Sequence, residues 1–207
     1  MESKCEYKML KFKVILAGSK HVGKSAIIAR FCDNTFMEKS SETIGVAFKR
    51  KLMSVNCFNS KIDADLVIWD FGGEEKYRVL FPNYVNKASG ALILFDLTRP
   101  ETLLDVDNWL RIIDANVEGV KKIIIGSKCD LIQERKVTRD MVFSFFKENS
   151  IEAEYIETSS KTGENVENAF TSLTKSIVLK GFQECHNCNE LITKNLKICG
   201  FCGQKTA

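Results

Sequence analysis

The segment Gly18–Ser25 constrains this chain most, because it sets two glycines and a Lys-Ser pair between an apolar strand and a helix. The apolar run 14–17 before it predicts a buried parallel strand, and residues 26–31 after it continue as a helix with an apolar face. Gly18 and Gly23 can reach positive φ without a Cβ clash, so the backbone between them can wrap an anion with its N–H groups. A glycine-rich turn that binds nothing is the weaker alternative in this context.

Two side chains of this segment add chemistry suited to a nucleotide. Lys24 supplies a point charge for β- and γ-phosphates, and the Ser25 hydroxyl is placed to bind Mg²⁺. The candidate phosphate-binding residues are Gly18, Ser19, Lys20, His21, Val22, Gly23, Lys24, Ser25 and Ala26.

Length and composition limit the number of domains and the classes of partner that the chain can have. With 207 residues, 44% of them hydrophobic, it can bury one ordinary core and carry one small appendage. A net charge of +3 does not indicate nucleic acid, and the basic run Lys49–Lys51 is typical of a solvated strand face. Apolar runs such as Ala91–Phe95 are far shorter than the ~20 residues of a membrane span, and the start shows no signal-peptide core. We therefore expect a cytoplasmic protein.

Strands and helices alternate along the chain. Apolar strand candidates lie near 11–17, 46–57, 61–69, 91–97, 122–127 and 153–158. Helical patterns lie near 102–116, 138–149 and 164–180. This order predicts an α/β fold, a mostly parallel six-stranded sheet with helices on both faces. Only the second and third strands have a short connection, so we expect them to pair as an antiparallel hairpin. The last helix should face the sheet with Val166, Phe170, Leu173 and Ile177.

Four further segments lie near the strand ends, where open α/β sheets bind ligands. A polar loop after the first helix contains Thr43, and Asp70–Gly73 ends the third strand. Ser127–Asp130 follows the fifth strand, and Thr158–Lys161 ends the sixth. These short segments indicate a ligand site only because they lie at strand ends near one another. A lone threonine or a strand-ending aspartate indicates nothing by itself.

Together with the phosphate-binding segment, these stretches resemble the small GTPases of the Ras superfamily over about residues 8–180. Ile44–Phe48 and Trp69-Asp70 look most like the Rab branch. The resemblance implies a P-loop GTPase fold and a switch that hydrolyses GTP to GDP and phosphate with Mg²⁺. It also implies protein effectors recruited in the GTP state through two switch loops, an exchange factor, an activating protein and a role in membrane traffic.

The resemblance also implies roles for single residues. Thr43 would ligate Mg²⁺ beside Ser25, and Asp70 would hold a Mg²⁺-bound water. The Gly73 N–H would approach the γ-phosphate, so loss of that phosphate would release both loops. The set that would act in hydrolysis is Lys24, Thr43, Gly73 and Glu74.

Asp130 indicates guanine, because its carboxylate can accept N1–H and the exocyclic N–H. Adenine has an acceptor at N1 and would leave the carboxylate unpaired, a mismatch that can discriminate by ~10⁴. The Lys128 stem would cover one face of the base. Phe36 would sit edge-on to the base, or else pack into the core. The expected base site is Phe36, Ser127, Lys128, Asp130, Leu131, Ser159, Ser160 and Lys161, with backbone N–H of the last three contacting guanine O6.

Three positions depart from the family pattern. Ser127 replaces an asparagine whose amide bridges base and phosphate loop, so we expect weaker nucleotide retention. Glu74 replaces the glutamine that orients water, and its charge repels the transferring phosphoryl group, so we expect slow hydrolysis. Lys20 replaces a small residue; it either pairs with Glu74, lies along the γ-phosphate or points to solvent.

A nucleotide-loaded binding module that does not hydrolyse GTP is the alternative function.

The tail has two Cys-x₂-Cys pairs separated by ten residues, a spacing typical of a zinc ribbon over 181–207. The expected zinc ligands are Cys185, Cys188, Cys199 and Cys202. The spacer Asn189–Ile198 is long enough for a hairpin and too polar for a core, so metal must supply the folding energy, ~10 kcal/mol or more. Iron is the next choice for such a site, and disulfides are the alternative that a reducing compartment disfavours.

The termini show no lipidation motif. The last residues are not Cys-a-a-X, and Glu2 is not the glycine needed for myristoylation. We therefore expect any membrane contact to come through a partner, with the ribbon as the candidate that binds a protein.

Overall fold

The computed structural model describes residues 9–36, 45–58, 60–72 and 81–206, and within these a six-stranded sheet has the order β2-β3-β1-β4-β5-β6. Its strands are β1 Leu10–Ala17, β2 Val46–Cys57, β3 Ser60–Phe71, β4 Gly90–Asp96, β5 Lys121–Ser127 and β6 Glu154–Thr158. β2 and β3 pair antiparallel, as the short connection between them predicted, and the other neighbours pair parallel. The predicted mixed sheet is confirmed.

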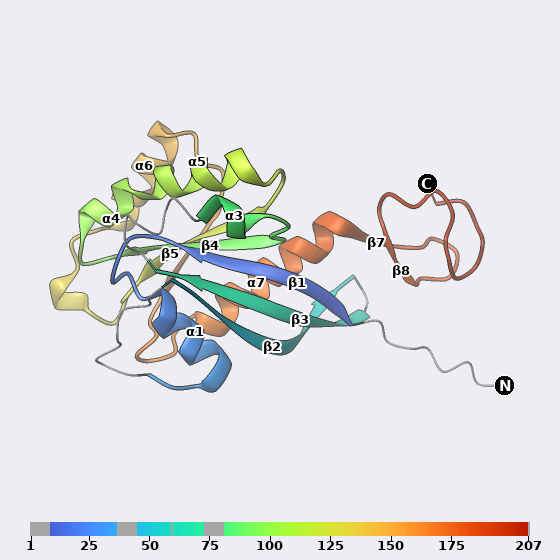
Figure 1. The fold of residues 1–207 in the computed structure, drawn as a ribbon, viewed down its shortest axis with the longest axis horizontal. Coiled ribbons are helices and arrows are strands. Elements are labelled where there is room, and N and C mark those ends of the chain that lie inside the picture. The colour runs from blue at the N-terminus through green and yellow to red at the C-terminus, as the bar shows by residue number, and fades with distance from the viewer. Residues whose placement is uncertain (1–8, 37–44, 59, 73–80, 207) are drawn as a thin grey trace.

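The helices lie on both faces of the sheet. They are α1 Lys24–Asp33, α3 Phe81–Val85, α4 Pro100–Leu104, α5 Val106–Asn116, α6 Arg139–Glu148 and α7 Val166–Gly181, with a 3₁₀ turn η1 at Ile132–Glu134. α1 and α7 cover one face, and α3 to α6 cover the other (Figure 1). The helix predicted over 102–116 is divided at Asp105, whose carboxylate accepts hydrogen bonds from Ser19 and Trp109. The Asp105 side chain forms no capping hydrogen bond to the backbone of α5, and through Ser19 it connects the break between the helices to the phosphate loop.

Alternate residues of β1 supply two hydrophobic cores, because neighbouring side chains of a strand point to opposite faces. Val14 and Leu16 belong to the core under α1 and α7, whereas Ile15 belongs to the core under α3, α5 and α6. The four residues predicted to anchor α7 are buried in the first core. Phe170 among them stacks on Phe31 of α1, with ring centroids 3.9 Å apart.

The C-terminal segment begins directly where α7 ends. β7 Phe182–Glu184 pairs antiparallel with β8 Leu191–Thr193, so the strands flank the first cysteine pair and do not lie within the spacer alone. Phe182 meets Phe12 of β1 edge to face, and Leu191 packs against the same core. These apolar contacts explain the position of the hairpin: its strands begin where they can bury side chains against the sheet. Figure 1 places the segment at the end of the sheet where β1 begins.

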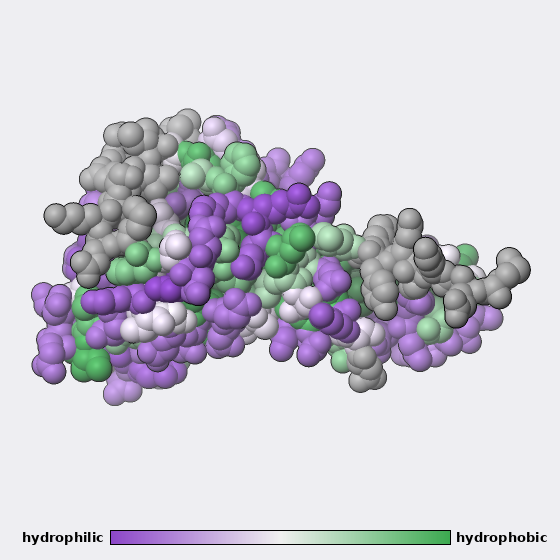
Figure 2. Space-filling view, turned by 90° about the horizontal axis from the view of Figure 1, so that it is seen from below, coloured by the Kyte–Doolittle hydropathy of each residue, from purple (hydrophilic) through white to green (hydrophobic). Residues whose placement is uncertain are grey.

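The surface of the described residues is mainly polar on the face drawn in Figure 2, where apolar side chains form small separate groups among hydrophilic ones. None of the helices in the described ranges has the length and apolar character that crossing a membrane requires.

Phe170→Ala should lower the free energy of unfolding by about 3–5 kcal/mol, because it leaves a cavity against Phe31 in a fully buried site. Phe48→Ala is the matched control: Phe48 is 71% exposed, and its loss should cost less than about 1 kcal/mol. Urea unfolding followed by circular dichroism measures both. Equal losses for the two variants would contradict the assigned core.

Candidate functional site

The backbone of the phosphate loop fits only if glycine stands at its first position. Gly18 has a φ of 137°, and a Cβ built on it would lie 2.2 Å from the carbonyl oxygen of Leu94 in β4. Gly23 has a φ of 97° and is the N-cap residue of α1. Because Gly23 has no side chain, the cap offers no acceptor to the first N–H groups of the helix. The loop therefore closes over β4 and presents a helix N-terminus, the arrangement that suits an anion.

Lys24 and Ser25 open α1, and both lie inside this loop region. The ammonium of Lys24 is buried and donates to the carbonyl oxygens of Gly18 (2.8 Å) and Ser19 (2.9 Å). The Ser25 hydroxyl donates to Asp70 Oδ2 at the end of β3, 2.5 Å away. A hydroxyl and a carboxylate oxygen side by side are hard donors of the kind that Mg²⁺ prefers, so these residues fit the predicted ion.

Three predicted residues, Thr43, Gly73 and Glu74, lie outside the described residues, so their assigned roles stay predictions. Lys20 is described, and its backbone carbonyl accepts a hydrogen bond of 2.8 Å from Nη2 of Arg99. The predicted pairing of Lys20 with Glu74 likewise stays a prediction.

Ser127 has a definite place at the end of β5. Its buried hydroxyl lies 2.6 Å from the carbonyl oxygen of Val22 in the phosphate loop and 2.8 Å from that of Phe95 in β4. One hydroxyl proton can serve only one of these acceptors at a time. Ser127 thus holds the phosphate loop against the sheet, which is one of the two contacts expected of the asparagine it replaces.

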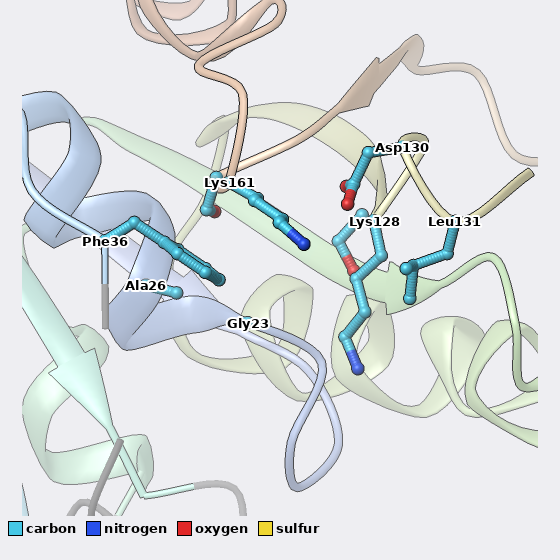
Figure 3. Close-up of a pocket in the computed structure, with 9 residues that line it drawn as sticks. Gly23, Ala26, Phe36, Lys128, Asp130, Leu131 and Lys161 are labelled. Carbon is cyan, nitrogen blue, oxygen red and sulfur yellow. The ribbon is translucent and has the colours of Figure 1, made fainter. Parts of the chain in front are cut away.

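A cavity of about 320 Å³ opens beside this loop, large enough for a small-molecule ligand. It is lined by Gly23, Ala26, Phe36, Ser127, Lys128, Asp130, Leu131, Ser160 and Lys161. Figure 3 shows Phe36 and Ala26 on one side, with Lys128, Asp130 and Leu131 on the other. Lys161 extends between the two sides. The structure therefore brings all but one of the predicted base-site residues around one cavity.

The remaining base-site residue, Ser159, is buried beneath the loop that lines the cavity. Its N–H donates to the carbonyl of Glu164, and its carbonyl accepts from Gly163 at 2.8 Å. Its hydroxyl accepts a hydrogen bond from the N–H of Thr162 at 3.1 Å. Ser159 thereby shapes the turn that presents Ser160 and Lys161.

Asp96, at the end of β4, binds Lys128, which lines the cavity, and Arg99, which binds the phosphate loop. It is fully buried, forms an ion pair with Lys128 (2.6 Å) and accepts a hydrogen bond from Arg99 (3.1 Å). Burial alone would raise the pKa of the Asp96 carboxyl, but hydrogen bonds from Lys128 and Thr98 outweigh it and hold that pKa below its usual value. Arg99 in turn binds Lys20. Asp96 was not predicted from the sequence, although it ends its strand with a carboxylate just as Asp70 does.

A second ion pair joins the segment that follows Asp130 to β6, the strand that leads into Ser159–Lys161. Arg135, beyond Asp130 in the chain, donates two hydrogen bonds to the Glu157 carboxylate, at 2.8 and 2.6 Å. Burial opposes ionisation of Glu157, but the bonds from Arg135 and Tyr155 hold its pKa below the usual value. No spacing pattern in the sequence points to this contact, because its partners lie 22 residues apart in irregular and strand segments.

The four predicted zinc ligands form one cluster. The Sγ atoms of Cys185, Cys188, Cys199 and Cys202 all lie within 4.8 Å of one another, and all four cysteines are free thiols. The sulfurs of Cys185 and Cys202 are 3.7 Å apart, as are those of Cys188 and Cys199. Four thiolates at about 2.3 Å from a tetrahedral zinc would lie about 3.8 Å from one another. A disulfide needs about 2.05 Å, so the arrangement fits a metal and not two disulfides.

Comparisons with known proteins agree with this arrangement. The Ras family model matches residues 13–179. Ras-related protein Rab-13 of Canis lupus familiaris is 32% identical over 190 residues, 91% of each chain. GTP-binding protein ypt4 of Schizosaccharomyces pombe is 34% identical over 81% of this chain and 72% of its own. Ras-related protein RABD2c of Arabidopsis thaliana is 35% identical over 83% of this chain and 82% of its own. The chain therefore belongs to the Ras family of small GTPases and has Rab proteins among its relatives.

Proposed function

We propose that this protein is a GTP-binding switch that hydrolyses GTP to GDP and phosphate slowly and with Mg²⁺. One observation supports this above the others: the cavity that contains Asp130 opens directly beside the phosphate loop. A base and its phosphates can therefore be bound by adjoining parts of one site. Membership of the Ras family and the names of the relatives support the same nucleotide.

Each part of the site has a separate task in this proposal. Lys24 and the backbone around Gly18 would bind the β- and γ-phosphates, while Ser25 and Asp70, which lie side by side, would hold Mg²⁺ together with Thr43. When bound, Mg²⁺ neutralises charge that develops on the phosphate oxygens. Gly73 and Glu74 would act at the γ-phosphate, and the negative charge of Glu74 would slow hydrolysis.

The base side of the site favours guanine over adenine. The Asp130 carboxylate can accept both N–H groups on one edge of guanine, and Ser160 and Lys161, which also line the cavity, can offer backbone N–H groups to O6. The carboxyl group of Asp130 points toward the cavity in Figure 3. Adenine would leave this acceptor unpaired, and an unpaired polar group in a binding site is costly.

The proposed partners are effectors that bind the GTP state, an exchange factor and an activating protein, in a role connected with membrane traffic. An aromatic surface supports the effector contact. Phe48 of β2, Trp69 of β3 and Tyr84 of α3 lie with ring centroids 6.0 Å apart for each neighbouring pair, and Phe48 is the most exposed. Aromatic side chains of this kind are enriched in protein interfaces. We place the protein in the cytoplasm, with membrane contact through a partner.

The C-terminal segment is proposed to be a zinc ribbon over 181–207 that follows a GTPase domain over 8–180. Its four sulfurs have the separation of a tetrahedral site, and apart from the cysteines Ile192 is the buried hydrophobic residue of its small core. Such a core is too small to fold alone, so bound metal would stabilise it. The ribbon would recruit a protein partner.

Hydrolysis is tested by single-turnover assay of the full-length protein loaded with GTP, with phosphate release and bound GTP followed together. We expect slow release that stops when Mg²⁺ is chelated. Asp70→Asn should reduce the rate by about 100-fold, because a Mg²⁺ contact contributes several kcal/mol. Asp63→Asn is the control on the same strand, since Asp63 is exposed and bonded to Ser54.

Stable GTP over many hours in the unmodified protein would support the binding module instead. Release of phosphate that persists without Mg²⁺ would contradict the assigned ion site. Tight binding of ATP in competition with GTP would contradict the role of Asp130.

Ser127→Asn should slow GDP release about fivefold, because an amide can hold the phosphate loop and also donate toward the base, worth ~1 kcal/mol. Stopped-flow displacement of a fluorescent GDP measures the rate. Ser144→Asn makes the same change on the exposed side of α6 and should leave the rate unaltered. Faster release from Ser127→Asn would show that the asparagine does not fit here.

The ribbon should contain one zinc ion per chain, measured by elemental analysis of the purified protein. Cys199→Ser should lose the metal and lower the unfolding temperature, because a buried thiolate ligand is removed. Cys32→Ser, outside the cluster, should keep the metal. Iron in place of zinc would correct the choice of metal, and a mass lower by four hydrogens would identify two disulfides.

A further inference from the structure

The last turn of α1 carries an arginine that binds two other segments of the nucleotide site. Arg30 donates from Nε to the carbonyl oxygen of Ser160 and from Nη2 to that of Lys161, both at 2.7 Å. Its Nη1 donates to the carbonyl oxygen and to Oδ1 of Asn34, at 3.2 and 3.0 Å. All three guanidinium nitrogens are therefore engaged, and each acceptor is a neutral oxygen.

Arg30 lies behind the wall of the cavity and not in it. Ala26, one helical turn earlier on the same face of α1, lines the cavity, whereas Arg30 does not. Among the described residues, no carboxylate pairs with Arg30. Its acceptors are instead three backbone carbonyls and the Asn34 side-chain amide oxygen, and hydrogen bonds from a charged donor to such oxygens are stronger than those between neutral groups.

The contacts with Ser160 and Lys161 determine how the base loop faces the cavity. In a planar trans peptide the C=O and the following N–H point in opposite directions. Because Arg30 binds the Ser160 carbonyl from behind, the N–H of Lys161 points away from Arg30, to the side of the cavity that Lys161 lines. The Lys161 carbonyl is held in the same way, and the N–H of Thr162 donates to Ser159 Oγ.

The contact with Asn34 holds the opposite wall. Asn34 is the C-cap residue of α1, with a φ of 53°, and its N–H donates to the carbonyl of Arg30. Phe36, two residues later, lines the cavity across from Asp130 (Figure 3). One guanidinium thus joins the segment that carries Phe36 to the loop that carries Lys161.

We propose that Arg30 is a positioning residue for recognition of the purine 6-position. It holds the Ser160–Lys161 peptide so that the N–H of Lys161 faces the base, and it does so without touching the nucleotide. The proposal rests on the proposed function, since it concerns how the same site binds a guanine nucleotide.

The test compares Arg30→Lys with the unmodified full-length protein. Lysine keeps the charge and the stem, but its single nitrogen cannot bind Ser160, Lys161 and Asn34 with the fixed geometry of a guanidinium. We expect GDP release to be about tenfold faster, because charge-assisted bonds to the base loop are lost. Arg111→Lys, on the exposed side of α5 where Arg111 pairs with Asp107, is the matched control and should release GDP at the normal rate.

Two nucleotide analogues separate a positioning role from a general structural one. In 6-thio-GDP sulfur replaces O6, and in inosine diphosphate the exocyclic amino group that Asp130 binds is missing. In Arg30→Lys the preference for GDP over 6-thio-GDP should fall toward one, while the preference for GDP over inosine diphosphate should stay unchanged. Equal weakening for all three nucleotides, or no weakening, would overturn the proposal.

Thermal unfolding of each variant accompanies these measurements. If Arg30→Lys does not fold, Arg30→Gln provides a neutral replacement that retains one donor group, and the same change in 6-thio-GDP preference is expected. If the unmodified protein binds neither GDP nor GTP, the proposed function fails and this proposal fails with it. Binding of GDP with unchanged analogue preference in the variants would overturn the role of Arg30 alone.

Discussion

The approach of Gly18 to the carbonyl of Leu94 is the constraint on which the nucleotide site depends. No side chain fits there, so the chain can leave β1, cross the end of β4 and return into α1 with its N–H groups turned inward. That path brings the Val22 carbonyl within reach of Ser127 and the Lys20 carbonyl within reach of Arg99. The parallel strands position the other residues of the site. Their C-terminal ends meet at one edge of the sheet, which places Asp70 and Ser127 beside the same loop.

Much of the fold could be predicted from the sequence, because strands buried on both faces are unbroken apolar runs, such as Ala91–Phe95. The antiparallel hairpin followed from one short connection, and the metal cluster followed from cysteine spacing. The division of the helix at Asp105 could not be predicted in this way, since the Asp105 carboxylate at the break binds Ser19, which lies 86 residues away. The same holds for the packing of Phe182 on Phe12, which joins the tail to the sheet.

Within the site, the residues that face a ligand were easier to predict than those that support them. Asp130 and Lys128 belong to a short segment after a strand, so their position alone suggests a role. Arg30 and Arg135 act on backbone or carboxylate groups far away in the chain, and such contacts leave no periodicity or motif in the sequence. Asp96 could be predicted only in part. The sequence shows that it ends a strand, but it does not show that Asp96 forms an ion pair with Lys128.

The tail is attached without a linker: α7 ends at Gly181, β7 begins at Phe182, and the Lys194 N–H donates to the Gly181 carbonyl. Apolar contact of Phe182 and Leu191 with the core fixes its direction. Figure 1 shows the tail at one end of the sheet, whereas the phosphate loop lies at the other. The cysteine cluster and the nucleotide site therefore lie at opposite ends of the molecule, and a protein bound at the cluster would leave the nucleotide end open to a second protein at the same time.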